Sequence, residues 1–365
     1  MTETIRVGVM GASLIGRRHG KAFGAIPGTE VLAIAEPNDT LRKQFVEEFG
    51  AKHEYKNYRE MVSAGDLDAV AIGLPTHLHA EASFAALDAD MHVLCEKPPT
   101  RNAEEMIVVA RKAHESGLTY AFGRQFRFAN ASLAARDLTA AGKLGSIYHA
   151  EARWVRTRHM PRDGRAWMTD KARGGGVLLD LGIHAIDEGW FIMGCPRPVE
   201  VFAGMHCAFG HIAPEGQVYT ADDTAVGAVR FENGATLHFI TSFSLNWPTT
   251  AKPKSPREPV NGEVHEATIY GSHGGLQIRG GGEEGTQVVG EMTGVRVSAI
   301  PTEKLTGAEA VDQMFQRQDE DFARAIREGG TPTNSAEQAV MLMQVLDALR
   351  ESGDTQKAVA IGKGH

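Results

Sequence analysis

The strongest constraint on the fold is a regular alternation of strand and helix patterns over residues 1–125. Apolar, β-branched runs are separated there by stretches whose apolar residues recur at helical spacing. The predicted strands are Ile5–Gly11, Val31–Glu36, Ala69–Pro75, His92–Glu96 and Thr119–Gly123. The predicted helices include Leu41–Phe49, His79–Leu87 and Ala103–Ser116. Because these strands are apolar nearly throughout, they predict a parallel sheet with helices on both faces.

The pattern changes after about residue 124, where longer strands follow one another. They are predicted at Tyr148–Val155, Val199–Phe209, Thr224–Phe231, Ala235–Ser244, Glu266–Tyr270, Leu276–Arg279 and Gln287–Val289. Asn233-Gly234 is a strong hairpin signal and favours an antiparallel sheet. Two helices, Ala308–Arg327 and Ala336–Arg350, are expected to end at Gly329 and Gly353. We therefore predict two domains, residues 1–124 and residues 125–365.

Composition excludes several classes of protein. The formal net charge of −8 argues against nucleic-acid binding, which needs a basic face. No apolar run is long enough to span a bilayer, and the N-terminus does not have the pattern of a secretory signal. The three scattered cysteines favour reduced thiols, so we expect a cytoplasmic protein without membrane partners. His77 and His79 lack a third ligand at suitable spacing, and we predict no metal site.

The stretch VGVMGASLIGRRH follows the first predicted strand and opens a helix. Gly11 and Gly16 occupy the first and third glycine positions of a dinucleotide-binding turn, whose middle position is Ser13. Backbone N–H groups at Ser13, Leu14 and Ile15 are then expected to face a pyrophosphate. The alternative is that these glycines serve packing alone.

Acidic and polar residues at other strand ends support the cofactor hypothesis. Glu36 ends the second strand, where a carboxylate binds ribose hydroxyls and repels a 2′-phosphate, so we predict NAD in preference to NADP. Further cofactor-binding candidates at strand ends are Pro75, Thr76, His77, Glu96 and Lys97. Lys97 is also a candidate to polarise a substrate hydroxyl, against the alternative of an ordinary solvated lysine. Arg124, after the fifth strand, is a substrate-binding candidate.

The stretch GGGVLLDLGIHAIDEGWFIMG, residues 174–194, is apolar but carries three ionisable residues. On an α-helix Asp180, His184 and Asp187 fall on one narrow stripe, because their spacings are i, i+4 and i+7. A helix apolar nearly all round is buried, so the stripe must face partners or a cavity. The alternative is a buried Asp–His pair with a structural role.

Four motifs, GxSxxGRRH, PTHLHAE, EKP and GGG-x3-D-x-G-x-H-x2-D, resemble the Gfo/Idh/MocA family of oxidoreductases. The resemblance covers nearly the whole chain in the right order. It implies an N-terminal Rossmann domain and a C-terminal α/β domain with a large, mostly antiparallel open sheet. It also implies NAD or NADP as cofactor, a sugar or polyol as substrate, and a homodimer or homotetramer formed through the C-terminal sheet.

The resemblance also assigns roles to residues. It implies that Lys97, Asp180 and His184 are catalytic and contact the substrate. Glu96 and Pro98 lie near the nicotinamide in this family, as does a tryptophan that matches Trp167. We expect His184 to accept the proton of a substrate hydroxyl while hydride passes to NAD, and Lys97 to stabilise the alkoxide.

A basic segment, Arg153–Arg173, precedes the glycines and holds seven Lys or Arg against two Asp. Arg156, Arg158 and Arg165 are candidates to bind an anionic group of the substrate, for which the guanidinium fork is suited. The alternative is a salt-bridged loop between subunits. Trp154 is a further candidate to pack on a sugar ring or on the nicotinamide.

Three functions compete at this point. The first is an NAD-dependent sugar or polyol dehydrogenase. The second is a redox glycoside hydrolase, which oxidises a ring hydroxyl, eliminates the aglycone and re-reduces the product with the same bound NADH. The third is a dinucleotide-binding regulator without catalysis, against which the presence of Lys97, Asp180 and His184 argues.

Overall fold

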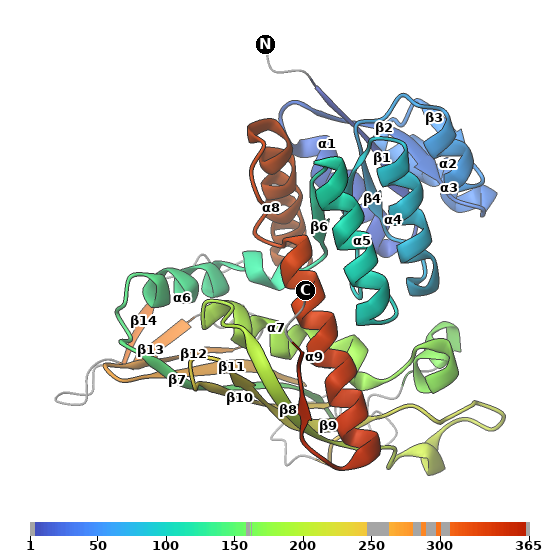
Figure 1. Cartoon of the computed structure of the whole chain (residues 1–365). Coiled ribbons are helices and arrows are strands. Elements are labelled where there is room, and N and C mark those ends of the chain that lie inside the picture. Colours follow the sequence, from blue (N-terminus) through green and yellow to red (C-terminus); the bar gives the residue numbers. More distant parts are fainter. Residues whose placement is uncertain are drawn as a thin grey trace. The chain divides into compact units, whose positions relative to one another are not determined.

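The chain divides into two compact units (Figure 1). The computed structural model describes residues 4–157, 161, 163–246, 263–279, 286–289, 297–300 and 307–362. The first unit comprises Met1–Phe128 and Gly307–Met343, and the second comprises Ala129–Thr306 and Gln344–His365. The change at Phe128 lies close to the predicted boundary at residue 124, but the return of the chain to the first unit at Gly307 was not predicted.

The first unit contains a parallel sheet of six strands in the order β3-β2-β1-β4-β5-β6. The strands are β1 (Ile5–Met10), β2 (Thr29–Ala35), β3 (His53–Tyr55), β4 (Ala69–Ile72), β5 (His92–Cys95) and β6 (Tyr120–Phe122). Five of the six were predicted. The exception is β3, whose three residues are too few and too polar to give a strand pattern.

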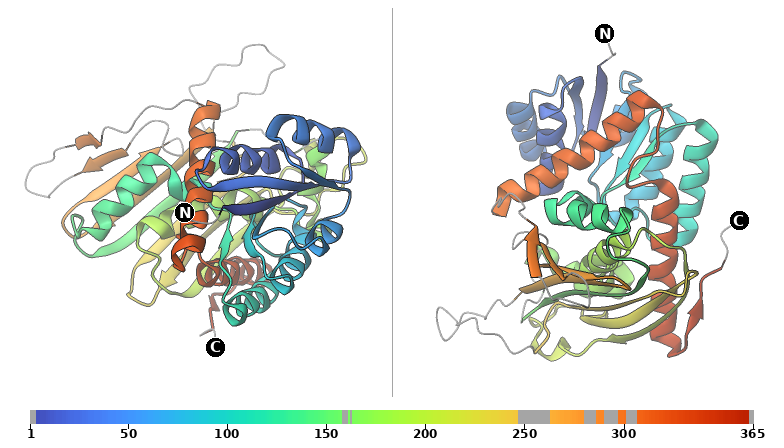
Figure 2. Two further views of the ribbon diagram at one scale, coloured as in Figure 1. Left: turned by 90° about the horizontal axis from the view of Figure 1, so that it is seen from above. Right: turned by 90° about the vertical axis from the view of Figure 1, so that its left-hand side faces the viewer.

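Helices cover both faces of this sheet. They are α1 (Leu14–Ala25), α2 (Asp39–Phe49), α3 (Tyr58–Ser63), α4 (His79–Asp88), α5 (Ala103–Ser116) and α8 (Gly307–Glu328). Helix α1 packs against α2 and α8, and α4 packs against α3 and α5, as the views in Figures 1 and 2 also show. This is the architecture that the strand–helix alternation predicts.

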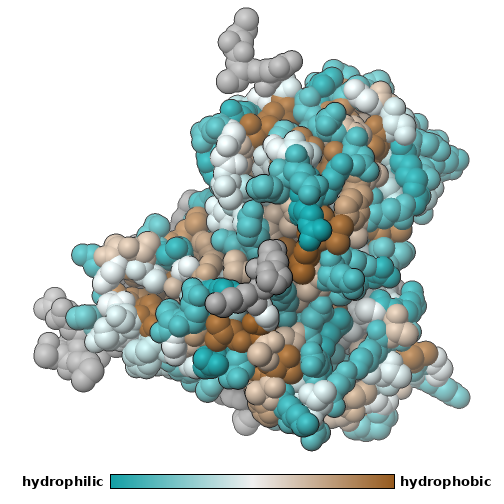
Figure 3. Space-filling view, in the orientation of Figure 1, coloured by the Kyte–Doolittle hydropathy of each residue, from teal (hydrophilic) through white to brown (hydrophobic). Residues whose placement is uncertain are grey.

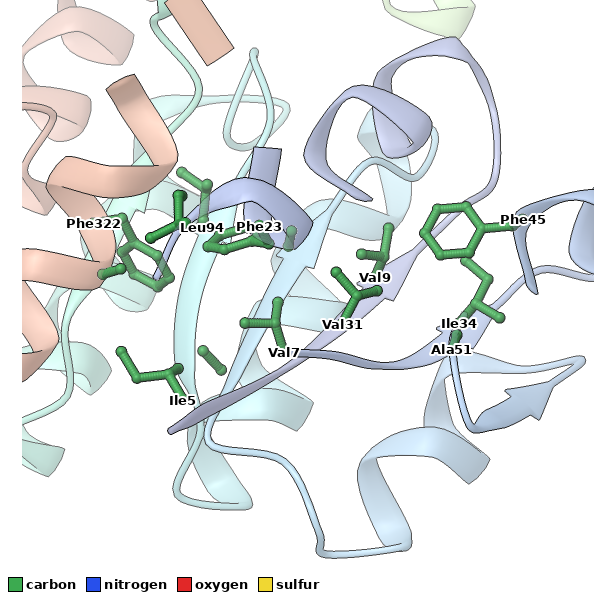
Figure 4. Packing of buried hydrophobic residues seen from close by; sticks show 14 of the residues in the cluster. Ile5, Val7, Val9, Phe23, Val31, Ile34, Phe45, Ala51, Leu94 and Phe322 are labelled. Carbon is green, nitrogen blue, oxygen red and sulfur yellow. The ribbon is translucent and has the colours of Figure 1, made fainter. Parts of the chain in front are cut away.

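Helix α8 joins the core of the first unit although it lies near the C-terminal end of the chain. Phe322 of α8 meets Phe23 of α1 edge to face, with ring centroids 6.4 Å apart, and both side chains are buried (Figure 4). The same cluster includes Ile5 and Val7 of β1 and Leu94 of β5. Full burial of one such aromatic side chain contributes about 1.5–3 kcal/mol. Helix α8 is therefore part of the hydrophobic core on which the six-stranded sheet packs.

The second unit contains a sheet of nine strands in the order β14-β13-β12-β11-β7-β10-β9-β8-β15. The strands are β7 (Ile147–Arg156), β8 (Pro198–His206), β9 (Thr224–Phe231), β10 (Thr236–Ser242), β11 (Glu263–Gly271), β12 (Gly275–Arg279), β13 (Thr286–Val289), β14 (Val297–Ile300) and β15 (Val359–Ala360). All neighbouring pairs are antiparallel except β7 with β10, which confirms the mostly antiparallel sheet. Gly234, with φ of 83°, turns the predicted hairpin between β9 and β10.

Two helices, α6 (Asn130–Ala140) and α7 (Ile183–Ile192), pack on one face of this sheet (Figure 2). Helix α9 (Ala336–Thr355) follows α8, and β15 then pairs with β8. The predicted end of α8 at Gly329 is confirmed by its φ of 64°. The predicted end of α9 at Gly353 is wrong, because the helix continues past it. That glycine instead allows a close approach: a Cβ there would lie 2.3 Å from Cγ of Met205.

Within the described residues, no helix is both long and apolar enough to cross a membrane. The hydrophobic residues visible in Figure 3 are interspersed with hydrophilic ones.

Candidate active site

The glycine turn after β1 brings backbone segments into close contact. Gly11 has φ of 95°, and a Cβ there would lie 2.7 Å from the carbonyl oxygen of Gly73. A Cβ on Gly16 would lie 1.8 Å from the carbonyl oxygen of Gly11. Both glycines are therefore required by the packing of the turn itself, so their presence alone does not demonstrate a nucleotide site.

The start of α1 has the chemistry of an anion site. Ser13 is the N-cap residue, yet its side chain makes no capping hydrogen bond, and the first turn contains no acidic residue. Ser13 and Leu14 are exposed, and Ile15 is half-buried. The first-turn N–H groups and the helix dipole of this 12-residue helix therefore suit a bound phosphate, as the sequence predicts.

Glu36 holds a fixed negative charge beside this turn. Its Oε2 accepts a hydrogen bond from the Ala12 N–H at 2.9 Å, and its Oε1 accepts one from the Asn38 N–H at 2.9 Å. The side chain is buried, but a carboxylate has lone pairs for about four hydrogen bonds, so each oxygen can accept a ribose hydroxyl as well. The arrangement fits a dinucleotide with a free 2′-hydroxyl.

The loops after β4 and β5 are joined by a buried histidine. Nδ1 of His79 lies 2.8 Å from the carbonyl oxygen of Pro98, and Nε2 lies 2.7 Å from that of Leu74. Two carbonyl acceptors require both ring nitrogens to donate, which is the protonated form. Burial by itself lowers the pKa of His79, but Cys95 and the two carbonyls outweigh it and raise the pKa to about 9. The imidazolium thus connects the PTHLHAE loop to the EKP loop.

These two loops carry most of the other predicted cofactor contacts. Pro75 and His77 are exposed, and Thr76 and Lys97 are half-buried. Both ring nitrogens of His79 are engaged by carbonyl oxygens, so this side chain has no free lone pair to offer a metal ion together with His77.

Glu96, directly before Lys97, belongs to a buried ionic cluster. Its Oε1 lies 3.2 Å from Nε2 of His19 on α1, and its Oε2 accepts a hydrogen bond from the Lys97 N–H at 3.1 Å. Nδ1 of His19 lies 2.9 Å from Oδ2 of Asp319 on α8. Burial raises the pKa of Glu96, but His19 and Lys97 outweigh it and lower the pKa below its usual value. This cluster fixes the backbone that leads into Lys97.

Arg124, a predicted substrate ligand, is fully buried. Its backbone N–H donates to Oε1 of Gln318 on α8 at 2.6 Å. The residue follows β6 as expected, but its position is determined by packing within the first unit.

In the second unit, three consecutive glycines, Gly174–Gly176, precede the segment that carries Asp180 and His184. Gly174 has φ of 78°, and a Cβ on Gly175 would lie 2.4 Å from the carbonyl oxygen of Met168. Gly176 has φ of 129°, and a Cβ there would lie 2.3 Å from Oδ1 of Asp222. Oδ2 of Asp222 accepts the Leu178 N–H at 2.9 Å, which satisfies a backbone donor at the start of the helix.

The segment that carries Asp180 is not α-helical, which corrects the sequence prediction. Leu178–Gly182 forms a π-helical turn, and α7 begins at Ile183. A π-helical turn is wider than an α-helical turn, so α-helical spacing does not relate Asp180 to His184. Such turns occur often at functional sites. His184 and Asp187 both lie in α7, every residue of which is buried, and this confirms the expected buried helix.

His184 lies against an aromatic residue of the sheet. Its ring centroid is 5.3 Å from that of Trp154 on β7, with the planes tilted by 51°. Trp154 in turn stacks on His265 of β11 with centroids 4.0 Å apart and an interplanar angle of 12°. Nε2 of His265 lies 3.0 Å from Oε2 of Glu188, which is buried on α7. Trp154 is thus buried between the rings of His184 and His265 and contacts both.

The arginine-rich segment is only partly described. Arg156 donates from Nε to Oε1 of Glu263 at 3.0 Å, and its guanidinium lies over the Trp154 ring. Arg158, its neighbour His159 and the side chain of Arg165 lie outside the described residues. Trp167 is 36% exposed, so its ring is open to a ligand.

The sequence missed several of these residues. His19 was visible in GRRH but had no assigned role, and its partner Asp319 is 300 positions away. Glu188 was a third acid in the buried run that starts at Asp180. His265 and Asp222 had no motif around them. The contacts of His265 become apparent only from the pairing of β7 with β11. Those of Asp222 become apparent only because the fold brings it next to the segment after the glycines.

Comparison with known proteins assigns the chain to a family. A model described as an oxidoreductase family with an NAD-binding Rossmann fold (GFO/IDH/MocA) matches residues 5–124, and one described as a GFO/IDH/MocA C-terminal domain matches residues 132–277. D-glucoside 3-dehydrogenase of Escherichia coli (strain K12) is 26% identical, over 99% of this chain and 98% of the relative. 1,5-anhydro-D-fructose reductase of Ensifer adhaerens is 32% identical, over 67% of this chain and 71% of the relative.

Solved structures agree with the fold. An oxidoreductase domain protein from Kribbella flavida has a TM-score of 0.86 at 24% identity, over 99% of this chain and all of the other. Levoglucosan dehydrogenase in complex with NADH and levoglucosan has a TM-score of 0.85 at 22% identity, with the same coverage. The motifs, the two folds and the two family matches together establish that the chain belongs to the Gfo/Idh/MocA family of NAD-binding oxidoreductases.

Proposed function

We propose that this oxidoreductase removes hydride from a secondary hydroxyl of a sugar or polyol and transfers it to NAD. The observation that carries the proposal is the presence of Lys97, Asp180 and His184 at the motif positions of the family. Full-length similarity to a D-glucoside 3-dehydrogenase supports a carbohydrate as substrate.

Each of these residues has a distinct role in the proposed reaction. His184 accepts the hydroxyl proton, for which a histidine near neutral pH is suited. Lys97 stabilises the negative charge that develops on the hydroxyl oxygen. Asp180 hydrogen-bonds the substrate or the imidazole. Bound NAD supplies the hydride acceptor.

NAD is proposed in preference to NADP because of Glu36. Its carboxylate is fixed by the N–H groups of Ala12 and Asn38 and cannot easily turn away from a 2′-phosphate. The residues that follow, Pro37-Asn38-Asp39, supply no cation to bind such a phosphate.

For the substrate, we propose binding by Lys97, Asp180 and His184, with the arginine-rich segment selecting for an anionic group. The ion pair of Arg156 with Glu263 supports a structural role for that arginine. Selection for an anion therefore depends chiefly on Arg158 and Arg165. Rates with neutral sugars and with the matching sugar acids test this, and a strong preference for the neutral sugars would contradict it.

The central experiment follows the absorbance of NADH when the purified protein is mixed with NAD and a panel of sugars, glucosides and polyols. We expect turnover with at least one of them. His184→Ala should lower kcat by about 10²–10⁴-fold, the usual contribution of a general base. Lys97→Met should also lower kcat, while the exposed Lys143→Met serves as a matched control. Near-normal turnover by His184→Ala, with NAD still binding, would show the assignment to be wrong.

The same samples test the redox glycoside hydrolase alternative. The relative named a D-glucoside 3-dehydrogenase keeps this alternative open, because a glucoside carries an aglycone that oxidation of the ring can help to expel. A hydrolase would release aglycone with no accumulation of NADH. A dehydrogenase would accumulate NADH and leave the glycosidic bond intact.

A further inference from the structure

A chain of side-chain contacts in the second unit, which we call the circuit, begins and ends on α7. It consists of His184, Trp154, His265 and Glu188. It starts on α7 at His184, crosses to Trp154 on β7 and then to His265 on β11, and returns to α7 at Glu188. His184 and Glu188 are four residues apart, so they lie about one helical turn from each other on the same side of α7. The circuit therefore joins three elements around one imidazole.

Trp154 is restrained on two sides. Its indole N–H donates to Oε1 of Glu263, which is also bound by Arg156. Its ring lies nearly parallel to the ring of His265. These two contacts restrain the orientation of the indole ring that touches His184.

The far end of the circuit is a buried carboxyl group, that of Glu188. Glu188 is 1% exposed, and its Oε1 accepts a hydrogen bond from Ser132 Oγ at 3.0 Å while its Oε2 faces His265. Buried polar groups are stable only when they have partners, and both oxygens of this carboxyl group have one. The carboxyl group therefore links His265 on β11 to α7 and, through Ser132, to α6.

We propose that Trp154, held in place by His265 and Glu188, is a positioning residue that fixes the orientation of the His184 imidazole for proton transfer. The inference rests on the proposed function, in which His184 is the base. An aromatic contact restrains the ring while leaving its nitrogens available to exchange a proton. Restraint of this kind matters because a displacement of about 1 Å at a catalytic group can cost about 100-fold in rate.

The test compares variants of the full-length enzyme. Trp154→Leu removes the ring that contacts His184, and Trp154→Phe keeps a ring there. Glu188→Gln replaces the buried carboxyl group by an amide of the same shape. The matched control is Trp190→Leu, because Trp190 is also a buried tryptophan, lies on α7 and donates its indole N–H to the carbonyl oxygen of Pro196.

Three readouts are measured on every variant: kcat and KM over a range of pH, the dissociation constant of NADH, and the melting temperature. Trp154→Leu should lower kcat by about 100-fold with little change in NADH binding, and Trp154→Phe should recover about tenfold of that loss. Trp190→Leu should lower the melting temperature without a comparable loss in kcat. Equal losses of kcat in Trp154→Leu and Trp190→Leu would overturn the proposal.

A spectroscopic readout keeps the inference separable from the proposed function. NMR of ¹⁵N-histidine-labelled protein, with the His184 signals assigned by their loss in His184→Ala, reports the ring directly. Glu188→Gln and Trp154→Phe should shift these signals, whether or not a substrate is known. Unchanged His184 signals in both variants would overturn the inference, even if Trp154→Leu failed to fold. Turnover by His184→Ala would instead overturn the proposed function.

Discussion

His19 and Asp319, which are 300 residues apart in sequence, form an ion pair in the interior of the first unit, with Nδ1 2.9 Å from Oδ2. Burial alone lowers the pKa of His19, but Asp319 and Glu96 outweigh it and raise the pKa from 6.5 to about 10. A raised histidine pKa stabilises the fold fully below the unfolded value and loses that effect as pH rises through the folded value. We therefore expect the melting temperature to fall between about pH 6.5 and about 10.

His19→Gln provides the comparison for this pH dependence. It leaves Asp319 and Glu96 buried without their cation, which should cost about 3–5 kcal/mol near neutral pH. The difference in melting temperature between wild type and variant should narrow as the pH approaches the pKa of His19. A difference that stays constant with pH would contradict the pairing. Breaking the exposed pair of Arg230 and Glu200 with Arg230→Gln should cost no more than about 1 kcal/mol.

Glu36→Ala should change the choice of cofactor. The substitution removes the carboxylate that accepts the Ala12 N–H and that we propose binds the ribose hydroxyls. We expect kcat/KM for NAD to fall and the NAD-to-NADP ratio of kcat/KM to fall by about tenfold or more, which corresponds to about 1.4 kcal/mol. The control is Glu54→Ala, an exposed acid on β3 that pairs with Arg42. An unchanged ratio in Glu36→Ala would remove the basis for the NAD preference.

Gly176→Ala should destabilise the entry to the π-helical turn. The residue has φ of 129°, and its Cβ would collide with Asp222. A strained backbone of this kind costs about 1–3 kcal/mol, before any displacement of Asp222 is counted. Urea unfolding checks the value. Gly24→Ala, inside α1 with open space around its Cβ, should instead stabilise by up to about 1 kcal/mol.

His79→Phe should weaken both stability and cofactor binding. It leaves the buried carbonyls of Leu74 and Pro98 without their donor, at about 1–3 kcal/mol for each group. Because those carbonyls belong to the loops that carry Thr76 and Lys97, the dissociation constant of NADH should rise as the melting temperature falls. Tryptophan-to-NADH energy transfer measures the binding. His114→Phe, on the exposed side of α5, should change neither quantity.

Much of the fold was predictable because it depends on local patterns. The alternation of apolar strands and amphipathic helices predicted five of the six strands of the first sheet, and Asn233-Gly234 predicted the hairpin of the second. The missing strand, β3, is three residues long and held only by its neighbour β2. Its existence depends on the sheet and not on its own residues.

Sequence position could suggest candidate site residues only where a motif is contiguous. Glu36, Lys97 and His184 are candidates of this kind. The π-helical turn at Leu178–Gly182 was not predictable in this way, because it depends on the close packing of the glycines against Asp222 and the loop before them. The partners of His184 come from separate strands that sequence spacing cannot bring together.

The return of α8 to the first unit has a consequence for any attempt to take this protein apart. A fragment that ends at Phe128 would keep the glycine turn, Glu36 and the EKP motif. It would lose α8, so Phe23 would be exposed to water and His19 would lose its partner Asp319. The N-terminal half of the chain therefore cannot be moved into another protein without α8. A chimaera that exchanges it for the corresponding half of another family member has to exchange α8 as well, so that both sides of the His19–Asp319 contact come from the same parent.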